Sequence, residues 1–170
     1  MEREQRFRDL LETHGSAIYR LAVFRERDPS ARADLQQEIA LGLWRALESF
    51  REESSERTWV LRIAHNIAAT HAIKAQTHKR RIEDLKLENS VAPAQQNRTP
   101  ESEAIGRAQL GRLEERIRAL DLISQQIVLL HLEGLSTQEI AETTGLSTTN
   151  VTTKLSRLRT ALAASQSEEP

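Results

Sequence analysis

The residues with the clearest chemical potential stand near the C-terminus, from Thr148 to Arg157. Threonine, asparagine, serine and arginine alternate there with aliphatic residues, and no acid occurs between Thr143 and Gln166. Short hydroxyl and amide groups hydrogen-bond to base edges, and cations pair with phosphates. We therefore predict that this segment reads duplex DNA, through Thr148, Thr149, Asn150, Thr152, Thr153, Lys154, Ser156 and Arg157.

A helix-turn-helix would position these side chains. Ser136 followed by Glu139 predicts a capping box, in which each side chain satisfies free amide donors of a first helical turn. Gly145 stands where a left-handed residue closes that helix, and Ser147 can cap the next one. The second helix would bury an apolar stripe of Val151, Leu155, Leu158 and Leu162. The alternative is an ordinary helical hairpin with a polar surface.

A second group of candidate residues lies between positions 57 and 81, where six basic residues and three histidines occur without an acid. Helical spacing places cations and an asparagine on one face, with a histidine beside them and a tryptophan at the start. Cations track phosphates, and an aromatic ring can stack on an unpaired base. We predict a site for melted DNA at Trp59, Arg62, His65, Asn66 and Arg80, although Trp59 taken alone fits a core position better than a DNA contact.

A third group lies on the helix predicted from Ala31 to Ser49. Its core stripe is Leu35, Ile39, Leu43, Ala46 and Phe50. The opposite face mixes acids with large apolar residues, a combination that suits a protein interface. We predict that Asp34, Gln37, Glu38, Leu41 and Trp44 bind a protein partner; the alternative is a solvated charged face with a packed tryptophan.

Charge and composition narrow the class of protein. The net charge is only −1, but acids outnumber bases eight to four between positions 26 and 56, next to the basic segment. A polyanion and a protein are therefore the expected partners. Without cysteine or paired histidines the sequence predicts no metal and no cofactor. It shows no nucleophile with a matching base, no spanning apolar run and no signal peptide, so we expect a cytoplasmic non-enzyme without membrane insertion.

Helical spacing runs through most of the chain, so we predict an all-α fold of two small helical domains joined by a flexible linker. The first domain would cover residues 1–85, with a helix ending near Asp28, a second capped by Ser30 and a long helix from Arg57 towards Arg81. Residues 86–103, rich in Asn, Ser, Pro, Gln and Thr, form the expected linker. The second domain would cover residues 104–165, followed by a tail at 166–170.

These features together resemble the sigma-70 superfamily of bacterial RNA polymerase initiation factors, in particular its short extracytoplasmic-function (ECF) type. The segment from Asp34 to Leu47 is similar to the region 2 helix that grips the polymerase β′ clamp. Thr58–Asn66 resembles the region that melts and reads the minus-ten element, and Glu133–Arg159 resembles the region 4 helix-turn-helix that reads the minus-thirty-five element. The sequence departs from the family pattern at Ala33, Ala40, His65, Thr70 and Thr152.

The resemblance implies a protein that binds core RNA polymerase, at the β′ clamp and the β flap, and directs it to promoter DNA. It implies no covalent chemistry, because binding energy for flipped bases offsets the few kcal/mol of unstacking. It also implies an anti-sigma factor or other regulator as a partner. The alternative function is a conventional helix-turn-helix activator or repressor with a helical sensing or dimerisation domain.

Overall fold

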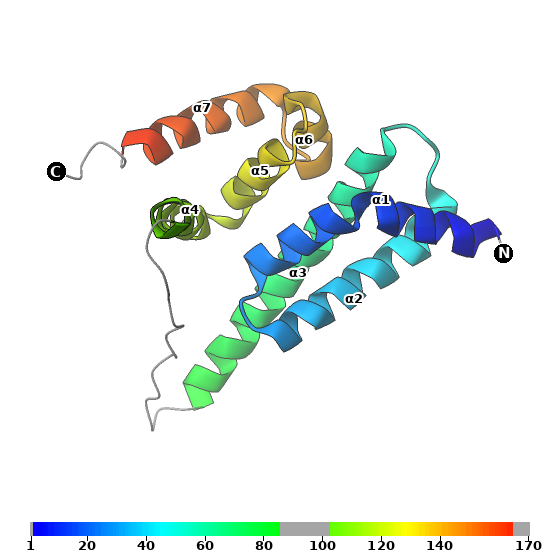
Figure 1. Cartoon of the computed structure of the whole chain (residues 1–170), viewed down its shortest axis with the longest axis horizontal. Coiled ribbons are helices and arrows are strands. Elements are labelled where there is room, and N and C mark those ends of the chain that lie inside the picture. Colours follow the sequence, from blue (N-terminus) through cyan, green and yellow to red (C-terminus); the bar gives the residue numbers. More distant parts are fainter. Residues whose placement is uncertain (1, 86–102, 165–170) are drawn as a thin grey trace.

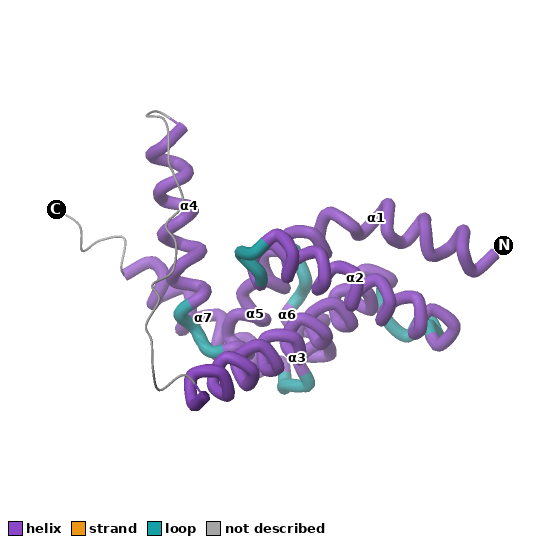
Figure 2. Tube along the Cα trace, turned by 90° about the horizontal axis from the view of Figure 1, so that it is seen from below, coloured by secondary structure: helices purple, strands orange, loops and turns teal. Residues whose placement is uncertain are grey.

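The computed structural model describes residues 2–85 and 103–164, which form seven α-helices, one short 3₁₀ helix and no strand. The N-terminal bundle consists of α1 (Glu2–Arg25), α2 (Pro29–Ala46), η1 (Leu47–Ser49) and α3 (Glu56–Leu85). The C-terminal bundle consists of α4 (Glu103–Arg118), α5 (Leu122–Leu132), α6 (Thr137–Thr144) and α7 (Thr148–Ala164). Figure 1 shows the two bundles side by side, and Figure 2 shows α4 extending away from the other helices. The all-α prediction is confirmed.

The N-terminal bundle is built around the stripe that the sequence predicts for α2. Leu35, Ile39 and Leu43 are fully buried against α1 and α3. Gly42 lets α2 approach α3 closely, because a Cβ atom there would lie 2.3 Å from Cδ1 of Ile67. The face of α2 opposite this stripe is consequently left on the surface.

The start of α2 differs from the prediction in one detail. Asp28, and not Ser30, caps the helix: its side chain accepts a hydrogen bond of 2.8 Å from the amide of Ala31. Pro29 occupies the first helical position, where its missing N–H costs nothing and its fixed φ suits the helix. The proline therefore moves the helix start two residues earlier than the serine suggests.

The two bundles are docked against each other, which the sequence did not predict. Ala17 of α1 and Leu61 of α3 are buried in one apolar cluster with Leu130, Leu135 and Ile140 of the C-terminal bundle. We call this contact surface, between α1 and α3 on one side and α4, α5 and α6 on the other, the domain seam. The predicted linker, except for Glu103, and the predicted tail lie outside the described residues.

Candidate nucleic-acid and polymerase interface

The helix-turn-helix is present as the sequence predicts. The amide of Glu139 donates to Oγ of Ser136 at 3.2 Å, and the amide of Ser136 donates to Oε2 of Glu139 at 2.9 Å, which completes the capping box. Gly145 closes α6 in the left-handed conformation, with φ 73°. Ser147 then accepts from the amide of Asn150 at 3.2 Å, so its hydroxyl caps α7. The turn between the two helices is thus fixed at both ends.

The outward face of α7 carries the predicted DNA-reading residues. Val151 and Leu155 are buried, which turns the opposite face to solvent. Thr152 also donates to the carbonyl of Thr148 at 2.9 Å, so its hydroxyl is engaged with the backbone. Of the eight predicted residues all are exposed except Lys154, which is half-buried: Thr148, Thr149, Asn150, Thr152, Thr153, Ser156 and Arg157. The arrangement offers hydroxyl, amide and guanidinium groups to one groove of a duplex.

The predicted site on α3 is only partly on the surface. Asn66 is exposed and Arg62 is half-buried, so both can reach a ligand. His65 and Trp59, in contrast, are 1% and 5% exposed. The prediction that His65 lies beside Arg62 and Asn66 on the outer face of α3 is therefore wrong. Arg80 belongs to α3, but its side chain lies outside the described residues.

Trp59 anchors the loop that precedes α3 to the core. Its ring packs against Phe50 with centroids 4.9 Å apart, and Phe50 stands at the other end of that loop. Within the loop Glu52 adopts a left-handed φ of 59°, which is uncommon for a residue other than glycine. The loop is therefore held at both ends while its middle is exposed.

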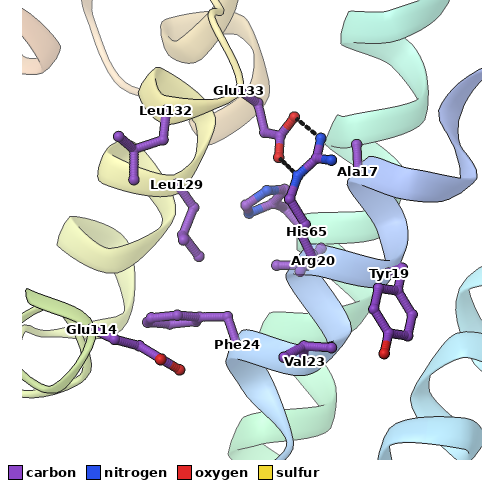
Figure 3. Close-up of a pocket in the computed structure, with 11 residues that line it drawn as sticks. Ala17, Tyr19, Arg20, Val23, Phe24, His65, Glu114, Leu129, Leu132 and Glu133 are labelled. Atoms are coloured by element: carbon purple, nitrogen blue, oxygen red, sulfur yellow. Dashed lines mark hydrogen bonds and ion pairs between the residues drawn. The ribbon is translucent and has the colours of Figure 1, made fainter. Parts of the chain in front are cut away.

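His65 is buried as a neutral side chain at the domain seam. Burial, aided by the nearby positive charge of Arg25, lowers the pKa of His65 to about 3. Its Nδ1 atom is buried without a hydrogen-bond partner. Figure 3 shows the imidazole between α1 and α5, next to a cavity lined by Phe24 and Leu129. A phosphate contact through this side chain would require the seam to open.

The predicted protein-binding face of α2 is exposed as expected. Asp34, Gln37 and Glu38 lie on the surface, and Leu41 is 47% exposed, which is high for a leucine. Trp44 differs, because it is half-buried beneath α1. Its ring lies 5.2 Å from that of Phe7, and the guanidinium of Arg3 covers it at 4.4 Å. Trp44 is therefore only partly available to a partner.

A groove joins this face to α3, lined among others by Glu38, Leu41, Asn66 and Lys74. His71 bridges two carboxylates beside it, with Nδ1 3.2 Å from Glu38 and Nε2 3.3 Å from Glu26. The predicted protein-binding and DNA-binding residues of the N-terminal bundle thus adjoin one another.

Sequence reasoning missed the polar residues of the domain seam. Arg20 of α1 donates two hydrogen bonds to Glu133, of 2.8 and 2.7 Å, and Thr58 donates to Glu139 at 2.6 Å. These pairs are separated by 113 and 81 positions, and no local pattern links them.

Comparison with known proteins decides the family. The family model for sigma-70 region 2 matches residues 10–78, and that for sigma-70 region 4 matches residues 110–162. The chain belongs to the sigma-70 family. The matched segments contain the exposed face of α2, the start of α3 and the helix-turn-helix, so this sigma factor carries both of the regions that the sequence resembles.

Individual relatives agree with this assignment. The chain is 32% identical to the ECF RNA polymerase sigma-E factor of Haemophilus influenzae, over 74% of this chain and 69% of the relative. It is 29% identical to the ECF RNA polymerase sigma factor SigX of Bacillus subtilis, over 88% of this chain and 78% of the relative. It is 28% identical to the RNA polymerase sigma factor NccH of Alcaligenes xylosoxydans xylosoxydans, over 93% of this chain and 85% of the relative.

Two solved structures share the fold. CnrH in complex with the cytosolic domain of CnrY superposes with a TM-score of 0.68 at 21% identity, covering 98% of this chain and 91% of that one. RpoE in complex with the anti-sigma factor NepR, from Bartonella quintana, superposes with a TM-score of 0.66 at 19% identity, covering 97% of this chain and 99% of that one.

Proposed function

We propose that this ECF-type sigma factor divides its work between three surfaces, one for core RNA polymerase and two for promoter DNA. The face of α2 formed by Asp34, Gln37, Glu38, Leu41 and the half-buried Trp44 binds core polymerase. The loop before α3, with Arg62 and Asn66, holds the melted minus-ten element. The outward face of α7 reads the minus-thirty-five element.

One observation carries the proposal. The capping box, the left-handed Gly145 and the buried Val151 and Leu155 present an acid-free polar face on the second helix of a helix-turn-helix. That face is exposed and unobstructed by the other described helices. A helix of this kind places its side chains in the major groove, where base pairs are distinguishable.

The mechanism uses binding energy and no covalent step. Cations such as Arg62 would neutralise phosphates, and hydrogen bonds to unpaired bases would offset the cost of unstacking them. Such a factor acts where the chromosome and the polymerase are, in the cytoplasm. Among the described residues, no helix is long and apolar enough to cross a membrane.

A protein regulator would act by covering the same surfaces. The structural relatives CnrH and RpoE are each bound to another protein, and NepR is an anti-sigma factor. The exposed Leu41 and its acidic neighbours offer such a regulator the surface that core polymerase would use. We infer that an anti-sigma factor of this protein competes with core enzyme at α2.

Core binding and promoter-dependent transcription test the proposal directly. Asp34→Lys/Glu38→Lys should weaken binding to purified core polymerase while leaving helicity unchanged, because both side chains are exposed. Glu4→Lys/Glu12→Lys is the matched control, since it makes the same charge change at exposed positions on α1. Equal core affinity of the two double variants would refute the α2 assignment. A conventional activator or repressor would bind its DNA site tightly without any polymerase, whereas a sigma factor should need core.

A further inference from the structure

The cavity beside His65 has the size and the lining of a small-molecule site. It has a volume of about 370 Å³ and lies between α1, α3, α4 and α5. Its apolar walls are made by Ala17, Leu21, Val23, Phe24, Leu129 and Leu132. Ligand pockets in proteins start at roughly 300 Å³ and are mostly apolar, with a few polar groups. An apolar cavity of ~150 Å³ holds benzene, so this cavity has room for a molecule of two fused rings.

Two large apolar side chains are exposed at the opening of the cavity. Tyr19 is 51% exposed and Leu132 is 65% exposed, and both line the cavity. Deeper inside, Phe24 is buried, and Figure 3 shows it on α1, facing Leu129 of α5. A flat apolar molecule between these side chains would remove their surface from water, and its rings would pack edge to face or offset against Phe24 and Tyr19.

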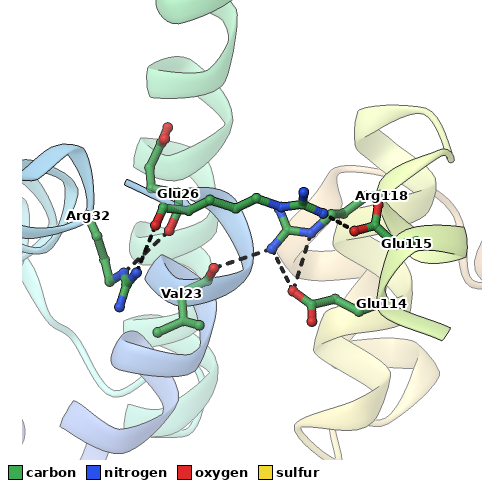
Figure 4. Close-up of polar contacts among 7 residues, drawn as sticks. Val23, Glu26, Arg32, Glu114, Glu115 and Arg118 are labelled. Carbon is green, nitrogen blue, oxygen red and sulfur yellow. Dashed lines mark hydrogen bonds and ion pairs between the residues drawn. The ribbon is translucent and has the colours of Figure 1, made fainter. Parts of the chain in front are cut away.

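The charged groups that line the cavity are already paired. Arg20 donates two hydrogen bonds to Glu133, of 2.8 and 2.7 Å. Glu114 accepts from Arg118 at 2.6 Å, and Arg118 also donates to the carbonyl of Val23 at 3.3 Å, as Figure 4 shows. An ionic occupant would lose its hydration and would have to displace one of these pairs. The lining therefore favours a neutral molecule.

The imidazole of His65 is the polar group that an occupant can satisfy. The side chain lines the cavity, the residue is 1% exposed, and its Nδ1 atom is buried without a hydrogen-bond partner. Because burial lowers the pKa of His65 to about 3, the ring is neutral and has one donor and one acceptor nitrogen. Rotation about the Cβ–Cγ bond turns either nitrogen toward the cavity. A hydroxyl both donates and accepts, so it suits either orientation of the ring.

Water is a poor occupant of the inner part of this space. A buried water molecule typically makes about three hydrogen bonds to polar groups that have no other partner. Phe24 and Leu129 offer none, and the charged lining groups are engaged with one another. A mainly apolar molecule with a single polar group matches this lining better than water does.

We propose that this cavity binds a small neutral aromatic molecule, with two fused rings and one hydroxyl or N–H group that hydrogen-bonds to His65. The rings fill the apolar space between Phe24 and Leu129, and the polar group points inward to the imidazole. The inference goes beyond the proposed function, because none of the residues assigned there to polymerase or promoter DNA lines the cavity.

Binding of 2-naphthol to the full-length chain tests the proposal, because this probe has two fused rings and one hydroxyl. In methyl NMR spectra we expect saturable shifts at Val23, Leu129 and Leu132, which line the cavity. Ile73 is the internal control, since it is 54% exposed on α3 and does not line the cavity. Equal shifts at Ile73 would mean that the probe adheres to any exposed apolar side chain. That result, or the absence of shifts at the lining residues, would overturn the proposal.

Substitutions that fill the cavity provide the matched variants. Val23→Phe and Leu129→Phe each add a ring at a half-buried position of the lining. Each should weaken the binding of 2-naphthol by roughly tenfold or more, because the probe loses its apolar contacts. Ile73→Phe makes a similar enlargement at an exposed position and should bind as the parent does. Circular dichroism shows which variants are folded. If a folded cavity-filling variant binds 2-naphthol as tightly as the parent, the probe does not occupy this cavity and the proposal fails.

The polar contact is tested with naphthalene, which has the same rings and no hydroxyl. The ratio of the affinity for 2-naphthol to that for naphthalene should be roughly two- to tenfold lower in His65→Leu than in the parent, because one hydrogen bond is lost. Comparing ratios cancels any general effect of the substitution on the size of the cavity. An unchanged ratio would show that His65 is not the partner of the hydroxyl, and would refute the assignment of the ligand's polar group.

Discussion

Acid should destabilise this protein through one buried imidazole. His65 is 1% exposed and burial lowers its pKa to about 3, whereas an unfolded histidine titrates near its ordinary value of 6.5. Below pH 6.5 the unfolded chain therefore takes up a proton that the folded chain does not, and the free energy of unfolding falls until the pH approaches 3. Stability from this group is fully present above pH 6.5.

The size of the effect follows from the two pKa values. Each pH unit below 6.5 removes up to ~1.4 kcal/mol, so the free energy of unfolding should fall by about 2 kcal/mol between pH 7.5 and pH 5. The carboxyl groups with lowered pKa values, Asp121, Glu133 and Glu139, act in another window. They stabilise the fold above their unfolded pKa values, near 4, and lose that contribution at lower pH. The interval from pH 7.5 to pH 5 therefore separates the contribution of His65 from that of these carboxyl groups, and a variant of His65 separates it from the other histidines.

Urea unfolding at pH 7.5 and pH 5 measures this difference. His65→Leu replaces the titrating side chain with an apolar one of similar volume. Between pH 7.5 and pH 5 the variant should therefore lose about 2 kcal/mol less free energy of unfolding than the parent. Val60→Ala is the control, because Val60 is fully buried in the same helix and does not titrate. It should lower the free energy of unfolding equally at both pH values. If His65→Leu and the parent lose the same amount, His65 is not held neutral and the reasoning is wrong.

Three further predictions concern single side chains. Trp59→Ala should cost roughly 3–5 kcal/mol of stability in thermal melting, and more than Trp44→Ala, because Trp44 is only half-buried. If a holoenzyme with folded Trp59→Ala still opens promoter DNA as the parent does, measured by permanganate reactivity of unpaired thymines, Trp59 has no melting role. Ser136→Ala should cost about 1 kcal/mol through loss of the α6 cap, and an unchanged melting temperature would contradict that role. Thr153→Ala should relax the sequence preference at one upstream base pair, at a cost of roughly 1–3 kcal/mol of binding free energy, whereas Arg62→Ala should weaken binding of the holoenzyme to promoter DNA with little sequence dependence. If Thr153→Ala lost the same affinity on all upstream sequences, Thr153 would not read a base.

Local signals in the sequence were sufficient for the helix-turn-helix. The Ser136 and Glu139 pair, Gly145 and Ser147 each act within a few residues, and all three features occur as predicted. The stripe of Leu35, Ile39 and Leu43 is likewise a property of one helix. Capping and periodicity depend on neighbours in the chain, so they can be recognised without the tertiary structure.

Burial on α3 could not be predicted in the same way. Helical spacing places His65 beside Arg62 and Asn66, but α1 and the C-terminal bundle pack against different sides of α3, and His65 lies on a covered side. Which side is covered depends on contacts such as Arg20 with Glu133, which join residues 113 positions apart. Docking of the bundles is a global property, and the sequence pattern within either bundle does not encode it visibly.

Glu139 has a consequence beyond the helix that it caps. One of its oxygens completes the first turn of α6 through Ser136, while the other accepts from Thr58 across the seam. Fraying of that turn and separation of the bundles are therefore thermodynamically coupled, and the amides at the start of α6 should exchange with solvent as one unit with bundle separation. For evolution this sharing of one carboxylate is a constraint. A substitution at Glu139 changes both the stability of the helix-turn-helix and the contact between the two bundles. Neither property can therefore evolve at this position without affecting the other.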